Sequence, residues 1–174
     1  MLILGIDPGT ATTGWGVLKV EGTNGKTKFS VRNYGCILTD KNREMHYRLL
    51  SLKEGINNSV SEYKPDAMVV EKIFFGVNHR TAIMVGQAIG AILLAAAEDH
   101  VPLFEYTGLT MKLVVADHGR ADKEQVQKAV LKHLGVRKLP AVKSQSGREI
   151  FRFRDDAYDA LALAICHVLK SQGA

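Results

Sequence analysis

The sequence predicts an α/β fold in which helices flank a five-stranded mixed sheet. A short apolar run at residues 2–6 ends at Asp7 and a Pro8-Gly9 turn, which is typical of a buried strand that opens a hairpin. An apolar stripe with helical spacing follows at residues 45–63, and a second short apolar run comes after it at residues 67–70. Because a helix between two strands forms a crossover, we expect the two apolar runs to lie parallel in the sheet.

Three antiparallel strands are expected at the start of the chain. Residues 13–20 form the strand that returns from the first turn, and residues 29–38 form the third strand. Residues 21–27 are expected to be a turn, because Asn24-Gly25 is a strong hairpin signal. Asp7 then stands at the mouth of the sheet, where its carboxylate can face a site instead of an apolar core. The alternative is a polar strand end with no further role.

Two long helices are expected in the middle of the chain. The first is capped by Asp40 or Asn42 and ends at residues 64–66. Its buried stripe consists of Met45, Leu49, Leu52, Ile56, Val60 and Tyr63. The second spans residues 79–98 and is apolar almost all round, which predicts burial on more than one side. One side meets the sheet, and the other fits either the core of a monomer or a second subunit.

The last third of the chain is expected to contain one strand and three helices. The strand covers residues 101–106, and a short helix covers residues 109–116. Asp122 and Gln125 have the spacing of a capping box, which begins a helix that ends at Gly135. After an exposed basic loop, Asp155-Asp156 begins the final helix, where acidic residues favour the positive end of the helix dipole. The buried stripe of this helix consists of Ala157, Ala160, Leu161, Ala164, Ile165 and Val168.

Charge and cysteine content limit the classes of function. The net charge is +5, and residues 118–154 hold ten Lys or Arg against three acidic residues. Such a basic region fits a polyanionic partner such as nucleic acid, or a solvated surface. Cys36 and Cys166 form no metal-binding or disulfide pattern, which is typical of a reducing cytoplasm. The start of the chain is unlike a signal peptide, and the longest apolar segment, residues 82–97, is short for a membrane span.

Four carboxylates are expected to converge on one edge of the sheet. Glu71 follows the strand at residues 67–70 directly, in the same kind of position as Asp7. Asp156 and Asp159 are three residues apart, so they share one face of the last helix. Carboxylate oxygens suit Mg²⁺ or Mn²⁺, and a pair of such ions supports phosphodiester cleavage. Each carboxylate alone is weak evidence, and the Asp156–Asp159 pair alone also fits an ordinary charged helix start.

Several segments resemble RuvC-type Holliday junction resolvases. They read GIDPGTATTGWGV, VVEKIFFG, VGQAIGAI, FEYTGLTMKLVVADHGRADKEQV and DDAYDALALAICH, and they occur in the family's order along nearly the whole chain. The resemblance implies a ribonuclease H-like nuclease domain over residues 1–174 that acts as a cytoplasmic homodimer. It also implies paired symmetric nicks across a four-way DNA junction in recombination and repair, with two Mg²⁺ or Mn²⁺ ions at each active site. A RuvA–RuvB branch-migration complex is the further partner that the resemblance implies.

The resemblance also assigns roles to individual residues. The family's acidic tetrad corresponds to Asp7, Glu71, Asp156 and Asp159, although some members have histidine where this chain has Asp156. In the same way Phe74 corresponds to the aromatic residue near the junction centre, with Phe75 beside it as the alternative. The family's basic residues near the cut strand correspond to Lys112 and Lys123. The connection at about 136–154 is longer and more basic than the family leads us to expect, which fits either a contact with a DNA arm or a disordered insertion.

Two other classes of function remain open from the sequence. The DPGT segment with Thr13 and Gly14 also resembles the phosphate loop of sugar kinases and actin-like ATPases. Those folds usually need two domains and a second phosphate loop, and tight ATP binding would distinguish them. The other alternative is a protein that binds junctions without cutting them, or a nuclease of the same fold that acts on structured RNA. Cleavage of a four-way DNA junction compared with a hairpin RNA would separate these.

Overall fold

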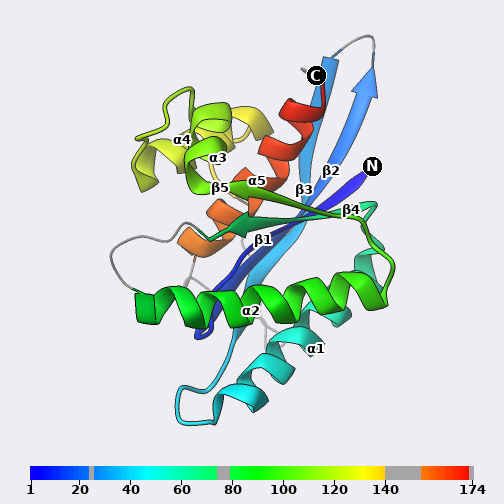
Figure 1. The fold of residues 1–174 in the computed structure, drawn as a ribbon. Helices are drawn as coiled ribbons and strands as arrows, with labels where there is room; N and C mark the ends of the chain where they lie inside the picture. The colour runs from blue at the N-terminus through cyan, green and yellow to red at the C-terminus, as the bar shows by residue number, and fades with distance from the viewer. Residues whose placement is uncertain (24–25, 74–78, 140–153, 173–174) are drawn as a thin grey trace.

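The computed structural model describes residues 1–23, 26–73, 79–139 and 154–172, and these residues form a five-stranded mixed sheet flanked by helices (Figure 1). The strands are β1 (Leu2–Asp7), β2 (Thr12–Thr23), β3 (Lys26–Leu38), β4 (Ala67–Lys72) and β5 (Leu103–Thr107). The helices are α1 (Met45–Tyr63), α2 (His79–Glu98), α3 (Gly108–Ala116), α4 (Lys123–Leu134) and α5 (Arg154–Gln172). The expected α/β class and the order of elements are confirmed. No helix in these described stretches is long and apolar enough to span a bilayer.

The sheet has the strand order β3-β2-β1-β4-β5. The first three strands pair antiparallel, whereas β1 pairs parallel with β4, and β4 pairs parallel with β5. The parallel pairing of β1 and β4 confirms the crossover that the sequence predicts through α1. Because β1, β4 and β5 run in one direction, their carboxyl ends meet at the same edge of the sheet.

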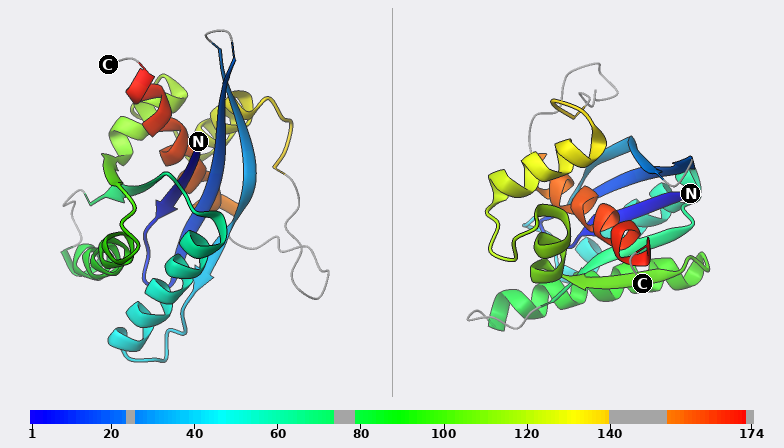
Figure 2. Two further views of the ribbon diagram at one scale, coloured as in Figure 1. Left: turned by 90° about the vertical axis from the view of Figure 1, so that its right-hand side faces the viewer. Right: turned by 90° about the horizontal axis from the view of Figure 1, so that it is seen from above.

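Two apolar cores lie on opposite faces of the sheet, since side chains alternate between the faces along each strand. One face packs against α1 and α2, through Leu4 and Ile6 of β1. The other face packs against α3, α4 and α5, through Ile3 of β1 and Val69 of β4. Figures 1 and 2 show the two groups of helices on either side of the sheet.

Helix α5 is buried more completely than its sequence indicates. The expected stripe of six residues is buried, and so are Ala162, Leu163, Cys166 and His167 on the remaining faces. The reason is tertiary: α5 lies against β1 and β2 on one side and against α3 and α4 on the other. A helix between two layers needs small or apolar residues all round, and periodicity shows only the face that is most consistently apolar.

Two local expectations were wrong. The turn expected at residues 21–27 is shorter, because β2 and β3 continue to the pair formed by Thr23 and Lys26. Polar residues are tolerated there because this end of the hairpin extends beyond the rest of the sheet (Figure 1). Helix α1 begins after Glu44 without a side-chain cap, rather than at Asp40 or Asn42. The Asp40 carboxylate instead accepts a hydrogen bond of 2.9 Å from the Asn42 backbone, which forms a turn before the helix.

Candidate active site

Asp7 and Glu71 lie side by side at the carboxyl ends of neighbouring strands. The register places Ile6 of β1 opposite Val70 of β4, and the two acidic residues come next on their strands. Side chains two or four residues apart on a strand point to the same face of the sheet. Asp7 therefore shares a face with Ile3, and Glu71 with Val69, which is the face that α5 covers. This confirms the shared edge that the sequence predicts for these two residues.

Gly14 allows the start of α5 to lie directly on the sheet. Gly14 pairs with Asp7 in the β1–β2 register. A Cβ at Gly14 would overlap the backbone carbonyl of Asp156 and would lie 2.8 Å from the Asp156 Cβ. Any larger residue would therefore push the first turn of α5 away from Asp7. Our reading of the sequence missed this role, although a glycine inside an alternating strand is a sign of close backbone approach.

A second glycine makes room for the side chain of Glu71. A Cβ at Gly108 would overlap the Glu71 Oε1 atom, so α3 begins directly beside this carboxylate. The helix start is fixed by Thr107, whose hydroxyl accepts a hydrogen bond of 3.1 Å from the Thr110 backbone. Lys112 lies one turn into this helix, and its ammonium group lines the same cavity as the Glu71 carboxylate.

The four predicted carboxylates share one electrostatic environment. Burial raises the pKa of Asp7 from 3.8 to about 8, and repulsion by Glu71, Asp159 and Asp156 adds to this effect. Burial is also the largest cause of the raised pKa values of Glu71, Asp156 and Asp159. Like charges raise one another's pKa only when they lie close together. The structure thus brings together Asp7, Glu71, Asp156 and Asp159 from three separate elements.

The two predicted lysines lie beside these carboxylates. Lys112 lowers the pKa of Glu71 and of Asp159, and Lys123 lowers the pKa of Asp156 and of Asp159, in each case against the larger effect of burial. A cavity of about 580 Å³ at this edge is lined by residues that include Glu71, Asp159, Lys112 and Lys123. Two of the four carboxylates and both ammonium groups therefore line one cavity, a combination that suits cations and a phosphate group.

The donor set fits a hard divalent cation. Carboxylate oxygens are preferred ligands of Mg²⁺ and Mn²⁺, and a bound cation would stabilise the charged forms of these four groups, whose pKa values burial raises. Within the described stretches, no three His, Cys, Asp or Glu side chains are already arranged so that they could hold a metal ion together. Mg²⁺ usually keeps several waters and takes one or two carboxylates together with phosphate oxygens, so it needs no closed protein cage.

Hydrogen bonds hold the loop that follows Asp7. The buried hydroxyl of Thr13 donates to the Gly9 carbonyl over 2.6 Å. Arg48 of α1 donates from Nη2 to the Thr10 carbonyl over 2.7 Å and from Nε to the Thr39 hydroxyl over 3.0 Å. A side chain from α1 thereby fixes the turn on which the position of Asp7 depends. Sequence reasoning missed Arg48, because nothing local links it to residues 8–11.

The start of α5 is tied to α4. Gln127 Nε2 donates a hydrogen bond of 2.8 Å to Asp155 Oδ1. Asp155 is exposed, and this contact gives it a structural partner beside the tetrad residue Asp156. Helix α4 itself begins with the capping box that the sequence predicts, in which Asp122 and Gln125 exchange hydrogen bonds of 2.8 and 2.9 Å. The capping box fixes the start of α4 at Lys123, and the bond from Gln127 to Asp155 links this helix to α5.

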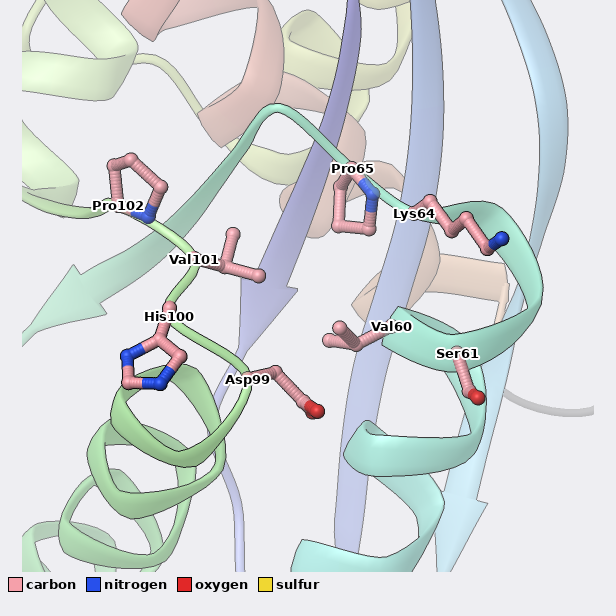
Figure 3. A pocket seen from close by; sticks show the side chains of 8 residues that line it. All are labelled: Val60, Ser61, Lys64, Pro65, Asp99, His100, Val101 and Pro102. Carbon is pink, nitrogen blue, oxygen red and sulfur yellow. The ribbon is translucent and has the colours of Figure 1, made fainter.

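The other predicted site residues lie outside the described part of the chain. Phe74 and Phe75 belong to residues 74–78, and most of the basic loop at 136–154 belongs to residues 140–153. A second cavity, of about 390 Å³, lies at the opposite edge of the sheet (Figure 3). It is lined by Lys64 and Pro65 before β4 and by His100 and Pro102 before β5, among others. It contains none of the predicted site residues.

Both the sequence and the fold of this chain are similar to those of known proteins. The sequence model of the family described as "Crossover junction endodeoxyribonuclease RuvC" matches residues 3–167. The protein of that name from Rubrobacter xylanophilus is 45% identical over 166 residues, which cover 95% of this chain and 84% of the relative. The structure of Thermus thermophilus RuvC superposes with a TM-score of 0.82 at 31% identity, and covers 99% of this chain and 96% of its own. A structure of T. thermophilus RuvC in complex with a Holliday junction substrate gives a TM-score of 0.81 at 28% identity, over 100% of this chain and 97% of its own. The chain therefore belongs to the RuvC family of crossover junction endodeoxyribonucleases.

Proposed function

We propose that this protein is a structure-specific endonuclease that resolves four-way DNA junctions by paired symmetric nicks, with residues 1–174 as one nuclease domain. The observation that carries the proposal is the convergence of four carboxylates and two lysines at the carboxyl ends of β1 and β4, beside a cavity that Glu71, Asp159 and both lysines line. Membership in the RuvC family supports it, as does the likeness to a T. thermophilus relative whose structure contains a Holliday junction substrate.

Asp7, Glu71, Asp156 and Asp159 are proposed to hold two Mg²⁺ ions, with Mn²⁺ as an alternative. RuvC proteins are metal-dependent nucleases, which agrees with this donor set. When bound, such ions act as Lewis acids that make water a better nucleophile and stabilise the departing oxygen. The four carboxylates would hold these cations at the edge of the sheet, where a phosphodiester can reach them. Lys112 and Lys123 bind the phosphate oxygens and offset the charge that develops on them.

A cleavage assay on a synthetic mobile junction tests the proposal. We expect the wild-type protein with Mg²⁺ to produce paired nicks on opposite strands of the junction, and to leave linear duplex and hairpin RNA of the same sequence intact. EDTA should stop the reaction. Binding of the junction without any nick, over a range of Mg²⁺ and Mn²⁺ concentrations, would contradict an endonuclease and favour a junction-binding protein.

Junction binding should weaken steeply with salt, because each Lys or Arg that contacts a phosphate releases counterions. Lys123→Ala should reduce the slope of log affinity against log salt by roughly 1, the value for one lost phosphate contact. Lys128→Ala is the matched control on α4, because Lys128 pairs with Glu124 over 2.8 Å at the exposed surface. Fluorescence anisotropy between 50 and 300 mM salt, at about five concentrations, measures both slopes. Equal slopes for the two variants would remove Lys123 from the DNA surface.

Helix α2 carries an apolar face that supports the proposed homodimer. Ile83 and Leu94 are 64% and 60% exposed and lie on one face with Gly90, where an added Cβ would meet nothing within 4 Å. Figure 2 shows α2 at the periphery of the molecule. A two-fold symmetric enzyme also matches two symmetric cuts.

Leu94→Glu should therefore convert a dimer into a monomer, since it would place two charges in an apolar contact. The control is Leu50→Glu, because Leu50 is half exposed on α1 and is not part of this face. Sedimentation velocity at micromolar concentration measures the change. A wild-type protein that sediments only as a monomer, with and without junction DNA, would refute the homodimer.

The remaining roles stay predictions from the resemblance. Phe74 is expected to stack on a base at the junction centre, with Phe75 as the alternative, and the basic loop at 136–154 is expected either to contact a DNA arm or to be a disordered insertion. A RuvA–RuvB complex is the expected partner, and the cytoplasm the expected location.

A further inference from the structure

Leu109 is an exposed apolar residue that lines the cavity of about 580 Å³ beside the four carboxylates. It belongs to the first turn of α3, directly after Gly108, and 65% of its surface is exposed. It lines the cavity together with Glu71 and Lys112. A Cβ at Gly119 would lie 2.8 Å from Leu109 Cδ1, so the side chain lies over the backbone of the α3–α4 connection. This contact restricts the orientation of the Leu109 side chain, whereas an exposed leucine without such a contact would rotate freely.

The cavity is lined by charged side chains and by apolar side chains, and the apolar ones together are called the apolar wall. Glu71, Asp159, Lys112 and Lys123 supply the charges, whereas Leu109, Met111 and Val126 supply the apolar surface. Met111 and Val126 are buried, so of these three Leu109 reaches furthest toward a ligand.

Thr107 also lines the cavity, but its hydroxyl already contacts Thr110. The Thr107 hydroxyl accepts from the Thr110 backbone over 3.1 Å and lies 2.9 Å from the Thr110 hydroxyl. The side chains of the apolar wall themselves carry no hydroxyl, amide or charged group that could form a hydrogen bond with a ligand. A polar group that is placed against this wall would lose its bonds to water without replacement.

The group that meets the apolar wall follows from the chemistry of a nucleic acid. A phosphate held between Lys112 and Lys123 has a sugar on each side of it, within one bond of its bridging oxygens. Deoxyribose has an apolar methylene at its 2′ position, whereas ribose has a hydroxyl there that donates and accepts hydrogen bonds. We propose that Leu109 packs against the deoxyribose beside the cut phosphate and thereby selects DNA over RNA at that nucleotide. This inference rests on the proposed endonuclease function.

The test uses four-way junctions that carry a single ribonucleotide, placed in turn on either side of the cleaved bond. In single-turnover reactions the wild-type protein should cut the all-DNA junction roughly tenfold faster than the junction with ribose at one of these positions, a factor that corresponds to one unsatisfied hydroxyl. Leu109→Asn is similar in size and offers polar partners, so it should reduce the ratio to about threefold or less. Leu113→Asn is the matched control, since Leu113 is 56% exposed on the same helix but does not line the cavity.

A 2′-fluoro nucleotide at the same position separates hydroxyl burial from sugar shape. Fluorine favours the sugar pucker of RNA but cannot donate a hydrogen bond, so the wild-type protein should cut this junction nearly as fast as DNA. Equal rates on DNA and ribose at both positions, slow cutting of the 2′-fluoro junction, or an unchanged ratio in Leu109→Asn would each overturn the role of Leu109. Failure of the wild-type protein to cut the all-DNA junction would overturn the proposed function, and this inference with it.

Discussion

Asp7→Asn is expected to abolish junction cleavage while it preserves junction binding. Asp7 is the most strongly perturbed member of the carboxylate set, and its pKa of about 8 reflects burial and the three like charges around it. An amide keeps the shape but removes the charge that would attract cations, so we expect single-turnover cleavage to fall by at least roughly a thousandfold. Affinity for the junction should change less than about threefold, since phosphate contacts elsewhere supply most of the binding energy.

The same substitution should stabilise the metal-free protein, in a way that depends on pH. The folded-state pKa of Asp7 lies above its ordinary value of 3.8, so the folded state holds this proton more tightly than the unfolded chain does. The stability of the wild-type protein in EDTA should therefore decrease as the pH rises from about 4 to about 8. Asp7→Asn removes the contribution of Asp7 to this dependence, leaves those of Glu71, Asp156 and Asp159, and should raise the free energy of unfolding by about 2 kcal/mol or more at pH 8. Chemical denaturation at pH 5 and pH 8 measures the effect.

Asp99→Asn is the control for both measurements, because Asp99 is exposed at the opposite edge of the sheet. It should cut junctions at the wild-type rate and leave the pH dependence unchanged. If Asp7→Asn cuts at a rate near that of the wild-type protein, Asp7 has no part in the chemistry. If it cuts nothing but is also less stable than the wild-type protein at pH 8 in EDTA, the loss of activity has a structural cause.

Gly14→Ala is expected to have the second largest effect. Its methyl group would overlap the Asp156 carbonyl, and that is backbone, which cannot move away as a flexible side chain does. Relief of the clash requires the first turn of α5 to shift, and Asp156 and Asp159 would shift with it. We expect a loss of about 1–3 kcal/mol in stability. Cleavage should fall by roughly a hundredfold in the protein that remains folded, the cost of about 1 Å of misplacement.

Gly22→Ala is the matched control on the same strand. Gly22 also lies in β2, and an added Cβ there would meet nothing within 4 Å. It should change neither stability nor cleavage beyond about 0.5 kcal/mol and twofold. Thermal unfolding and single-turnover cleavage at a temperature where both variants are folded give the comparison. A Gly14→Ala protein with wild-type cleavage would mean that the position of α5 on β2 does not control the site.

Much of the fold and the candidate site follows from short-range patterns. The apolar runs at residues 2–6 and 67–70 predict β1 and β4, and the helical stripe between them predicts α1. The structure confirms that β1 and β4 are parallel. Asp7 and Glu71 could be placed together because each ends a strand, and strand ends in a crossover meet at one edge. Asp156 and Asp159 could be paired because helical spacing puts them on one face. The capping box at Asp122 is likewise local, and the structure contains it.

The sequence by itself determined which elements form and which carboxylates they carry, because alternation, helical spacing and caps involve residues within a few positions of one another. Only the tertiary structure decided how closely those elements approach. Gly14 under Asp156 and Gly108 beside Glu71 are contacts between elements far apart in the chain, and no local pattern specifies their distance. The pKa of Asp7 also depends on how closely elements approach, because burial and repulsion by Glu71 of β4 and by Asp159 and Asp156 of α5 arise only when these elements pack together.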